Sequence, residues 1–324
     1  MRIPVWLAVA VCGCGAVTSS AADLADRFRA EAPIGWSALR EFSLSSRGTV
    51  REITVPQAGA KQNGKRFEVV YRWNNNAGNE RFETAYEEGP MAGSVSAIVA
   101  NQRYGSSLAR RGNDKPFYVK NFGWNPQGAR DQMDEYRLQA YALKVDAESA
   151  DGIVRDPSFK MLDIRSKNSG DEELIEVDFN CDVKHRPSYN VKGGQIVFSP
   201  AKKWAVVSYA LKIQYPDAIG LSRGTSEYSP QAIDGIPIIT RHVCSRTDAT
   251  ETLAYFQITL DYSEIGRGTA TDEECSLPAF GLPEMQRPGA VFPTKALALC
   301  IGVGLLFLVA AVFIRRRRNQ TVTG

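Results

Sequence analysis

Four residues with metal-binding chemistry lie in two close pairs, Cys181 with His185 and His242 with Cys244. In an extended strand, side chains two or four residues apart share a face, so each pair could present two ligands to one side of a sheet. Structural Zn²⁺ prefers thiolate and imidazole, but Cys-x-x-x-His and His-x-Cys are not standard zinc spacings. A disulfide between Cys181 and Cys244 would need the same proximity, and ordinary packing of buried thiols is the third interpretation. We expect no bound metal or cofactor.

Two other segments have the spacing of a catalytic or nucleotide-binding motif without its context. Gly59 to Lys65 is spaced like a phosphate-binding loop, but Arg66 replaces the Ser or Thr that holds magnesium, and a strand follows where a helix is needed. Ser199-Pro200-Ala201-Lys202 has the Ser-x-x-Lys spacing of penicillin-recognising enzymes, but its flanks favour strands and the chain lacks a Lys-Thr-Gly partner. Because no nucleophile, base and orienting group occur together, the sequence predicts that the protein is not an enzyme.

The first 22 residues have the pattern of a secretory signal peptide. A basic residue, Arg2, precedes the apolar run Ile3 to Val11, and small residues follow up to the predicted cleavage site before Asp23. The apolar run has about nine residues, whereas a membrane span needs about twenty. Val11-Cys12-Gly13-Cys14 also resembles a bacterial lipobox in which Cys14 would be acylated, so lipidation is an alternative.

A second apolar segment, Ala296 to Ile314, contains 19 residues and no charge. As a helix it would be about 28 Å long, which is enough to span a bilayer. Four arginines follow at once, Arg315, Arg316, Arg317 and Arg318. Since basic residues stay on the cytoplasmic side, we expect a single-pass protein with its N-terminal domain outside the cytoplasm, in a bacterial inner membrane facing the periplasm. Processing of the C-terminal helix as a sorting signal is the alternative, although the preceding segment lacks the Thr-Gly of a sortase site.

Composition and charge exclude several classes of protein. The 324 residues are 44% hydrophobic and 23% charged, with 27 Gly, 16 Pro and 6 Cys, which excludes a collagen, a low-complexity disordered chain and a dense disulfide scaffold. The formal charge is +3, but the stretch from Asp23 to Ile314 holds 34 basic and 36 acidic residues, a net charge of about −2. A nucleic-acid partner is therefore not expected.

Hydropathy patterns predict a mostly β, α+β domain. Helical spacing predicts a short helix over Asp23 to Ala32 and a long one from Asn125-Pro126 to about Glu148. Short runs rich in β-branched and aromatic residues predict strands at 49–55, 66–73, 80–86, 94–103, 117–122, 160–165, 174–183, 195–198, 204–215, 220–228, 236–245 and 252–262. The predicted organisation is a signal peptide at 1–22, an exported β-rich domain at 23–263, a Pro/Gly-rich stalk at 264–295, a transmembrane helix at 296–314 and a cytoplasmic tail at 315–324.

This succession of elements favours one large curled antiparallel sheet, or half-barrel, over a parallel sheet, which would need a crossover helix after nearly every strand. Two smaller β-domains meeting near Gly152 are the alternative. Gly194 to Pro200 followed by Trp204, and Tyr228 with Asp234-Gly235-Ile236-Pro237, resemble strand and turn motifs of the bacterial lipoprotein-carrier family. The resemblance covers residues 152–246, about a third of the chain, and implies a half-barrel that wraps helices and cradles lipid in its concave face.

A cavity of that kind would be lined by aromatic and apolar side chains. The candidates are Trp73, Trp124, Met133, Tyr136, Phe198 and Trp204. We therefore expect a membrane-anchored envelope protein whose exported domain binds a lipid or another apolar molecule and whose anchor contacts the bilayer. The alternative is a scaffolding domain without catalytic activity that binds another envelope protein, its cavity filled by side chains.

Overall fold

A computed structural model describes residues 20–54, 63–140, 142–185, 189–216, 218–251 and 254–286. The described residues include three α-helices. α1 (Ala21–Glu41) precedes the strands, and α2 (Gln127–Ala140) and α3 (Ala150–Arg155) lie between the sixth and the ninth strand of the chain. The strands of the large sheet are β1 (Leu44–Thr54), β2 (Asn63–Asn74), β3 (Asn79–Glu88), β4 (Ser94–Ala100), β5 (Gly105–Arg111), β6 (Tyr118–Gly123), β9 (Lys160–Ser169), β10 (Glu172–His185), β11 (Tyr189–Ser199), β12 (Ala205–Gln214), β13 (Ile219–Tyr228), β14 (Ile239–Asp248) and β15 (Ala254–Arg267). A small ribbon, β7 (Lys144–Val145) with β8 (Glu148–Ser149), and two 3-10 helices, η2 (Pro200–Lys202) and η3 (Leu277–Phe280), complete the described elements.

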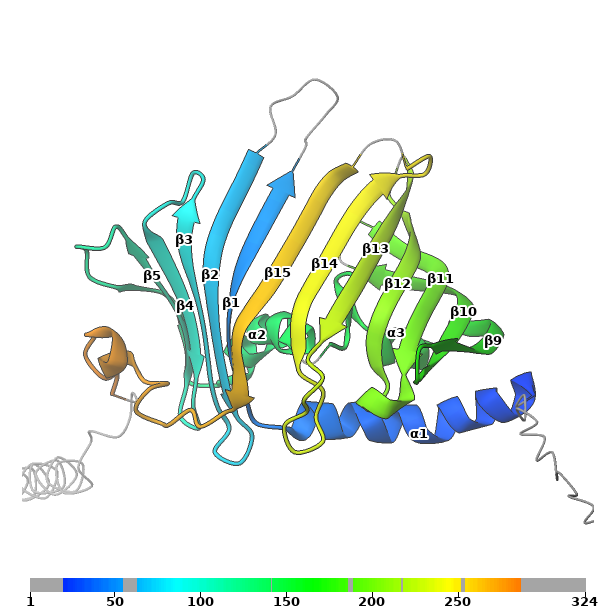
Figure 1. Ribbon diagram of the computed structural model, residues 1–324. Coiled ribbons are helices and arrows are strands. Elements are labelled where there is room, and N and C mark those ends of the chain that lie inside the picture. Colours follow the sequence, from blue (N-terminus) through cyan, green and yellow to red (C-terminus); the bar gives the residue numbers. More distant parts are fainter. Residues whose placement is uncertain are drawn as a thin grey trace, which may run out of the picture.

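The thirteen strands form one open antiparallel sheet built from two meanders (Figure 1). Strands β1 to β6 form the first meander and β9 to β15 the second, and the first strand pairs with the last, with Val50 opposite Leu260. Strands β6 and β9 remain as the two edges. The predicted mostly β architecture with a large, unclosed antiparallel sheet is confirmed, and both halves of the chain contribute to the same sheet.

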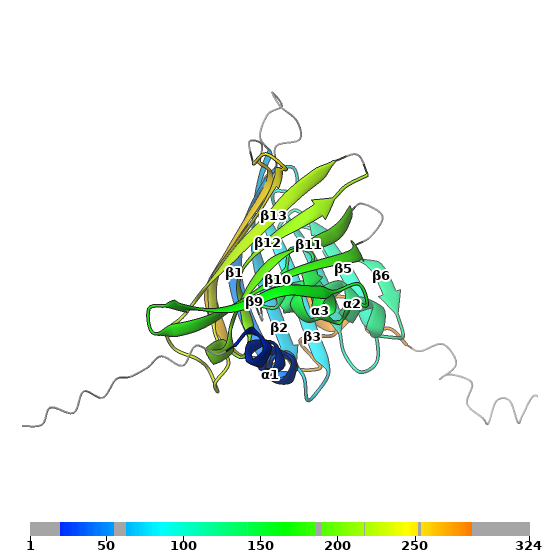
Figure 2. The same ribbon diagram turned by 90° about the vertical axis from the view of Figure 1, so that its right-hand side faces the viewer.

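Alternation along the central strands separates an apolar inner face from a polar outer face. On β2 the inner side chains are Phe67, Val69, Tyr71 and Trp73, and Phe82 of β3 lies opposite Tyr71. Aromatic and β-branched residues favour strands because they pack well on a pleated, half-buried surface. The sheet curls around this face, and all three helices lie on its concave side (Figure 2).

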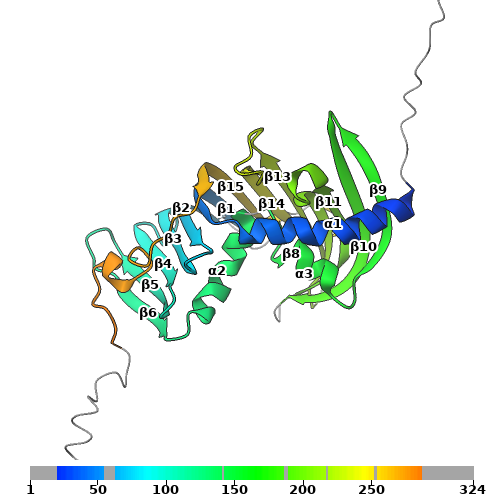
Figure 3. The same cartoon turned by 90° about the horizontal axis from the view of Figure 1, so that it is seen from below.

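Helix α1 crosses beneath the strands of the second meander and closes the lower opening of the half-barrel (Figure 3). Its N-terminus is capped reciprocally by Ser20 and Asp23, which satisfies two otherwise unpaired backbone donors. Sequence patterns predicted a shorter helix that ended at Ala32. The helix continues through Pro33 because its buried face continues, with Trp36 and Leu39 in the core.

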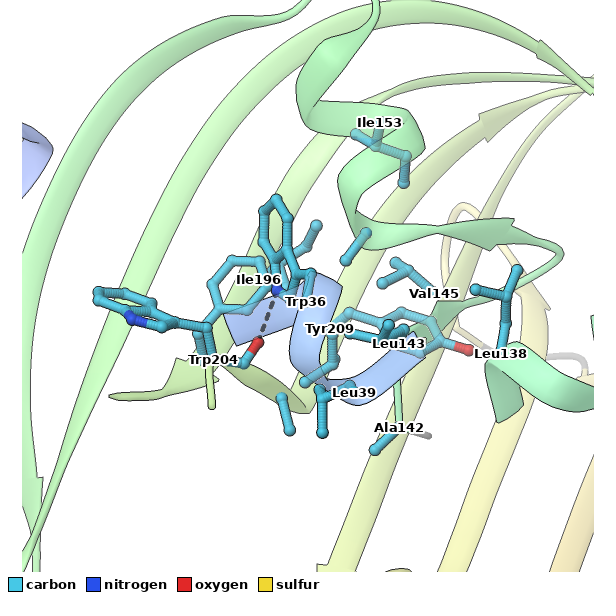
Figure 4. Packing of buried hydrophobic residues seen from close by; sticks show 14 of the residues in the cluster. Trp36, Leu39, Leu138, Ala142, Leu143, Val145, Ile153, Ile196, Trp204 and Tyr209 are labelled. Carbon is cyan, nitrogen blue, oxygen red and sulfur yellow. Dashed lines mark hydrogen bonds between the residues drawn. The ribbon is translucent and has the colours of Figure 1, made fainter. Parts of the chain in front are cut away.

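The long helix predicted up to Glu148 is shorter in the structure. α2 ends at Ala140, and the chain then turns through positive φ angles at Ala142 and Asp146 to form the β7–β8 hairpin before α3. These turns carry Leu143, Val145 and Ile153 into the core beside Trp36 (Figure 4). A continuous helix would have placed these apolar side chains around a cylinder instead of against the curved sheet.

The structure also differs from the predicted stalk over residues 264–282. Residues 264–267 belong to β15, and the following segment binds the outer face of the first meander, where it buries Ala270, Cys275, Leu277 and Phe280. Its contacts there are Ala97 and Val99 of β4, Leu108 of β5, and Tyr104 in the turn between these two strands. Those apolar side chains need a cover to leave water, and the segment supplies it. We call residues 268–286 the outer strap.

Several predicted segments lie outside the described residues. They are most of the signal peptide (1–19), the rest of the stalk (287–295), the predicted transmembrane helix and the arginine tail. The predicted cleavage site before Asp23 falls within the first turn of α1. Within the part of the chain that the structure describes, no helix is long and apolar enough to span a membrane.

Candidate ligand-binding site

A cavity of about 210 Å³ lies on the concave side, between the C-terminal half of α2 and the central strands. It straddles the seam between the two meanders. At this seam β1 pairs with β15 (Figure 1). Its walls are mostly apolar and aromatic. The lining residues are Ser46, Val50, Glu52, Phe67, Val69, Tyr71, Phe82, Tyr136, Gln139, Ala140, Lys144, Ile258, Leu260 and Tyr262.

Helix α2 forms one wall and leaves the space open. Tyr136 stacks on Phe82 of β3, with the ring centroids 3.7 Å apart, and closes that side of the cavity. One turn later the helix presents the short side chain of Ala140, which lines the cavity together with Val50 and Leu260 of the sheet. A large side chain followed by a small one on the same helical face therefore maintains the gap.

Polar groups gather at one end of the cavity. Glu52, near the end of β1, accepts a hydrogen bond from Lys65 Nζ at 3.0 Å. Gln139 of α2 and Lys144 of β7 add two more polar side chains to the lining. At the other end, about 20 Å away along β1, the wall contains the buried hydroxyl of Ser46. The cavity thus combines an apolar length with a polar end carrying charges of both signs, which suits a molecule with one polar end.

A buried acid lies behind the cavity wall. Glu80 is fully buried and accepts a hydrogen bond from the wall residue Tyr71 at 2.8 Å. Burial raises the pKa of Glu80 to about 7, while the positive charges of Arg137 and Arg130 oppose that rise. Its second carboxylate oxygen has no partner in the described structure, nor does the buried indole nitrogen of Trp73. Glu80 is therefore poised to change charge near neutral pH.

A second buried polar cluster ties the β7–β8 hairpin to the sheet. Asp146, at the hairpin tip, accepts two hydrogen bonds from Arg246 at 2.9 and 3.0 Å, one from Tyr189 at 2.9 Å and one from Ser222 at 3.1 Å. The Arg246 guanidinium also lies over the Tyr189 ring, 4.9 Å from its centroid. The carboxylate is well satisfied, so the cluster stabilises the fold rather than offering a vacant binding site. No sequence pattern pointed to it.

The positions of Cys181 and Cys244 decide between the interpretations of this pair. Cys181 and Cys244 lie on β10 and β14, which three strands separate, so they are roughly 19 Å apart across the sheet. Both are free, as is Cys275, and all three are buried. The possible Cys181–Cys244 disulfide is therefore excluded, and the free, buried thiols agree with the interpretation of ordinary packing. The Cys181 thiol donates a hydrogen bond to the Val191 carbonyl at 3.3 Å. Burial raises the pKa of all three thiols.

The histidine beside Cys244 also has a packing role. His242 is buried, and its Nδ1 is 3.0 Å from Ser226 Oγ. Burial lowers the pKa of His242 to about 4, so the ring is neutral at pH 7. The side chain of His185 lies outside the description, and no group of three potential metal ligands occurs among the residues that the structure does place.

The Ser-x-x-Lys motif has a structural arrangement. Ser199 caps η2 by accepting a hydrogen bond from the Lys202 backbone N–H, and its hydroxyl donates to Glu172. Lys202 Nζ also pairs with Glu172 rather than with the serine hydroxyl. The lysine is thus held by a carboxylate instead of being placed to deprotonate Ser199. Of the segment spaced like a phosphate-binding loop, the described residues Asn63 to Lys65 begin β2.

Of the six residues predicted for the cavity, Tyr136 lines it. Phe198 and Trp204 pack instead against Phe28 and Trp36 of α1, and the Trp36 indole N–H donates to the Trp204 carbonyl at 2.8 Å (Figure 4). The other three also lie elsewhere: Met133 is fully buried in the core, Trp73 lies under Arg137, and Trp124 packs on the outer-face cluster.

The positions of aromatic residues do not predict the aliphatic wall formed by Val50, Val69, Ile258 and Leu260. The sequence does contain one signal for this wall. Every second side chain of a strand lies on the same face, so these residues share the inner face with the other inner side chains of their strands. This alternation alone could not show that the two strands at opposite ends of the chain are neighbours, because that depends on the pairing of β1 with β15.

Comparisons with known proteins find similarity of fold. No protein-family model matches the sequence, and no curated protein matches it. Among solved structures, a DUF1329 family protein from Desulfovibrio piger is 9% identical with a TM-score of 0.43, over 78% of this chain and 98% of that one. A proposed outer membrane lipoprotein-sorting protein domain from Vibrio parahaemolyticus is 9% identical with a TM-score of 0.42, over 78% and 97% of the two chains. A LolA superfamily protein from Nitrosomonas europaea is 13% identical with a TM-score of 0.38, over 77% and 99%. The predicted resemblance to the lipoprotein-carrier family is confirmed as a weak one, and it is to the fold alone.

Proposed function

We propose that this chain is a membrane-anchored envelope protein whose exported domain binds an acyl chain or a similar apolar molecule in the cavity beneath α2. The observation that carries the proposal is the cavity itself, with apolar walls along β1, β2 and β15 and a polar end where Glu52 pairs with Lys65. The anchor is the apolar segment Ala296 to Ile314, which places the domain on the outer side of a bacterial inner membrane.

The size of the cavity restricts the ligand. Sites for small molecules usually enclose about 300–1,000 Å³. A volume of about 210 Å³ is below that range, so the cavity accepts part of one chain and not a whole phospholipid. Burying apolar surface there gains about 25 cal/mol for each Å² removed from water. The polar end would keep the head group of such a ligand in contact with water.

Photo-crosslinking tests the proposal on the full-length chain in detergent micelles. The probe is a palmitic acid that carries a diazirine near the end of its chain, and mass spectrometry of peptides locates the adducts. We expect adducts on the peptides that contain Val50, Tyr136 or Ala140. Val69→Phe, which fills the cavity, should lower their yield at least tenfold. The matched control is Val70→Phe, because Val70 is the next residue of β2 and faces the outer side of the sheet.

Two outcomes would overturn the binding proposal. Adducts confined to the apolar segment 296–314, with the same yield in Val69→Phe, would show that the probe reaches the anchor and not the cavity. An unchanged yield of cavity adducts in Val69→Phe would show that the labelling does not depend on this space. Either result would favour the alternative function, a scaffolding domain, and its partner would then be sought by cross-linking in cells.

A further inference from the structure

The contacts of the outer strap determine beside which edge of the sheet the chain leaves the folded domain. Phe280 packs on Phe117, next to β6, with ring centroids 5.1 Å apart. The Tyr104 hydroxyl binds the strap twice, accepting from the Leu277 N–H at 2.9 Å and donating to Glu284 at 3.0 Å. The last described residue, Gln286, therefore leaves the domain beside β4, β5 and β6, on the outer face (Figure 1).

Chain length then limits the distance between this edge and the bilayer. Nine residues, 287–295, connect Gln286 to the predicted membrane span, and they reach at most about 30 Å when fully extended. The sheet is much wider. Its thirteen strands have twelve spacings of about 4.8 Å, so β9 lies roughly 58 Å from β6 along the curved sheet. The linker therefore keeps the β6 edge within reach of the membrane surface and sets no such limit on the β9 edge.

The hairpin between β5 and β6 has the chemistry of a membrane-binding surface. From Arg110 to Lys120 it carries four basic residues and one acidic residue, Asp114. Arg111, Lys115 and Lys120 are exposed, and so are two apolar side chains, Tyr118 at 43% and Val119 at 37%. Exposed aromatic and aliphatic groups beside several basic residues are typical of segments that bind anionic bilayers. Tyr118 and Val119 are consecutive residues of the edge strand and face opposite sides of the sheet, so the surface in question is the β6 edge itself. We call the residues around this edge, Arg111, Lys115, Tyr118, Val119 and Lys120, the basic hairpin patch.

The strap next to this patch carries four acids, Asp272, Glu273, Glu274 and Glu284. Glu274 is paired with Arg72, and Asp272 and Glu284 are paired with Arg103. In the patch, Lys115 has a neighbour in Asp114 at 3.9 Å, and the Arg110 guanidinium stacks over Phe117, 5.0 Å from the ring centroid. The four strap acids with Arg72 and Arg103 carry a net charge of −2, and the hairpin from Arg110 to Lys120 carries +3, so this edge keeps a net charge of about +1.

We propose that the basic hairpin patch docks on the anionic lipid surface of the membrane that holds the anchor. This inference rests on the proposed anchoring at 296–314. Docking would fix the half-barrel in one orientation, with β6 against the bilayer and β9 directed away from it. Each Lys or Arg near an anionic surface changes partitioning by about fivefold, so removing two should reduce docking by more than tenfold.

The test uses the full-length chain in nanodiscs of phosphatidylethanolamine and phosphatidylglycerol. A photoreactive benzoyl-phenylalanine replaces Tyr118 in one variant and, as the matched control, Leu162 in another. Leu162 is 61% exposed on the opposite edge strand, β9. We expect lipid adducts at position 118 and at least tenfold fewer at position 162. Arg111→Glu with Lys120→Glu should abolish the difference, whereas Arg111→Lys with Lys120→Arg should preserve it.

The outcomes separate docking from anchoring. If sodium carbonate extracts the chain from the membranes before the nanodiscs are assembled, the chain is not integrated. The proposed anchor then fails, and the docking inference fails with it. If the chain stays integrated but position 118 gives no lipid adducts, or gives as many as position 162, docking alone is overturned. Adducts between position 118 and a second copy of the chain would also overturn it, because the patch would then be a protein interface.

Discussion

Replacing Asp146 by Asn should destabilise the fold strongly without straining the backbone. Asp146 has φ of 60° at the tip of the β7–β8 hairpin, a conformation that Asn tolerates nearly as well as Asp. The substitution keeps the volume of the side chain and removes its charge. Arg246, whose side chain is 22% exposed, then loses the carboxylate that accepts its two hydrogen bonds.

The expected cost follows from the burial of the pair. Removing one partner of a buried ion pair costs about 3–5 kcal/mol, and the partial exposure of Arg246 lowers this to roughly 2–4 kcal/mol. For a domain of this size, about 1 kcal/mol lowers Tm by roughly 2–4 °C. The control is Asp163→Asn on β9, whose carboxylate pairs with Arg165 at 2.8 Å but is 53% exposed. That pair should contribute less than about 1 kcal/mol.

Urea unfolding of the full-length chain, followed by tryptophan fluorescence, measures both variants. Replacing Arg246 by Met in the Asp146→Asn background should recover part of the loss, because the unpaired charge is then absent. The reasoning would be refuted if Asp146→Asn and Asp163→Asn lowered the free energy of unfolding equally. It would also be refuted if the effects of Asp146→Asn and Arg246→Met added without coupling.

Three further predictions concern groups that the fold buries. Since burial raises the pKa of Glu80 to about 7 from 4.5, the native state binds a proton more tightly than the unfolded state, so this group's contribution to stability falls between about pH 4.5 and 7. Glu80→Gln should remove that loss of stability, which is on the order of 3 kcal/mol. Urea unfolding of both chains across this pH range measures it, and a pH-independent difference between their free energies of unfolding would contradict the prediction. Gly224→Ala should cost about 1–3 kcal/mol because the new methyl group meets the Tyr209 ring at 2.2 Å, whereas Gly266→Ala, with nothing within 4 Å, should be nearly neutral in the same assay. Finally, the three buried thiols should react with a maleimide only after unfolding, and a reductant should leave Tm unchanged; rapid labelling of the folded chain would contradict the free, buried state.

Local patterns were sufficient for the class of fold. Alternation along β2 and β10 and the turn residues between strands predict antiparallel strands, and they do so because each strand buries one face. Boundaries were less accurate where packing decided them. Helix α1 continues past Pro33 since the sheet needs Trp36 and Leu39, and β5 was missed because its sequence, GSSLARR, has little apolar alternation.

The candidate site depended on contacts that no local pattern contains. Tyr136 was predicted because a helix facing a curled sheet must present its apolar side chains to the sheet. Val50 and Leu260 form one wall only because β15 pairs with β1 across more than two hundred residues. The pairing of Asp146 with Arg246 is similarly remote, and charged residues alone do not reveal their partners.

The sequence by itself determined the composition class, the β-rich character and the expectation of a signal peptide and an anchor, because each depends on hydropathy over a short stretch of chain. Tertiary structure decided the rest. It joined the two meanders at β1 and β15, placed α1 over Phe198 and Trp204, and folded the outer strap onto β4 and β5. The physical reason is that apolar burial is not directional: it requires that each apolar face be covered but does not specify by which distant segment.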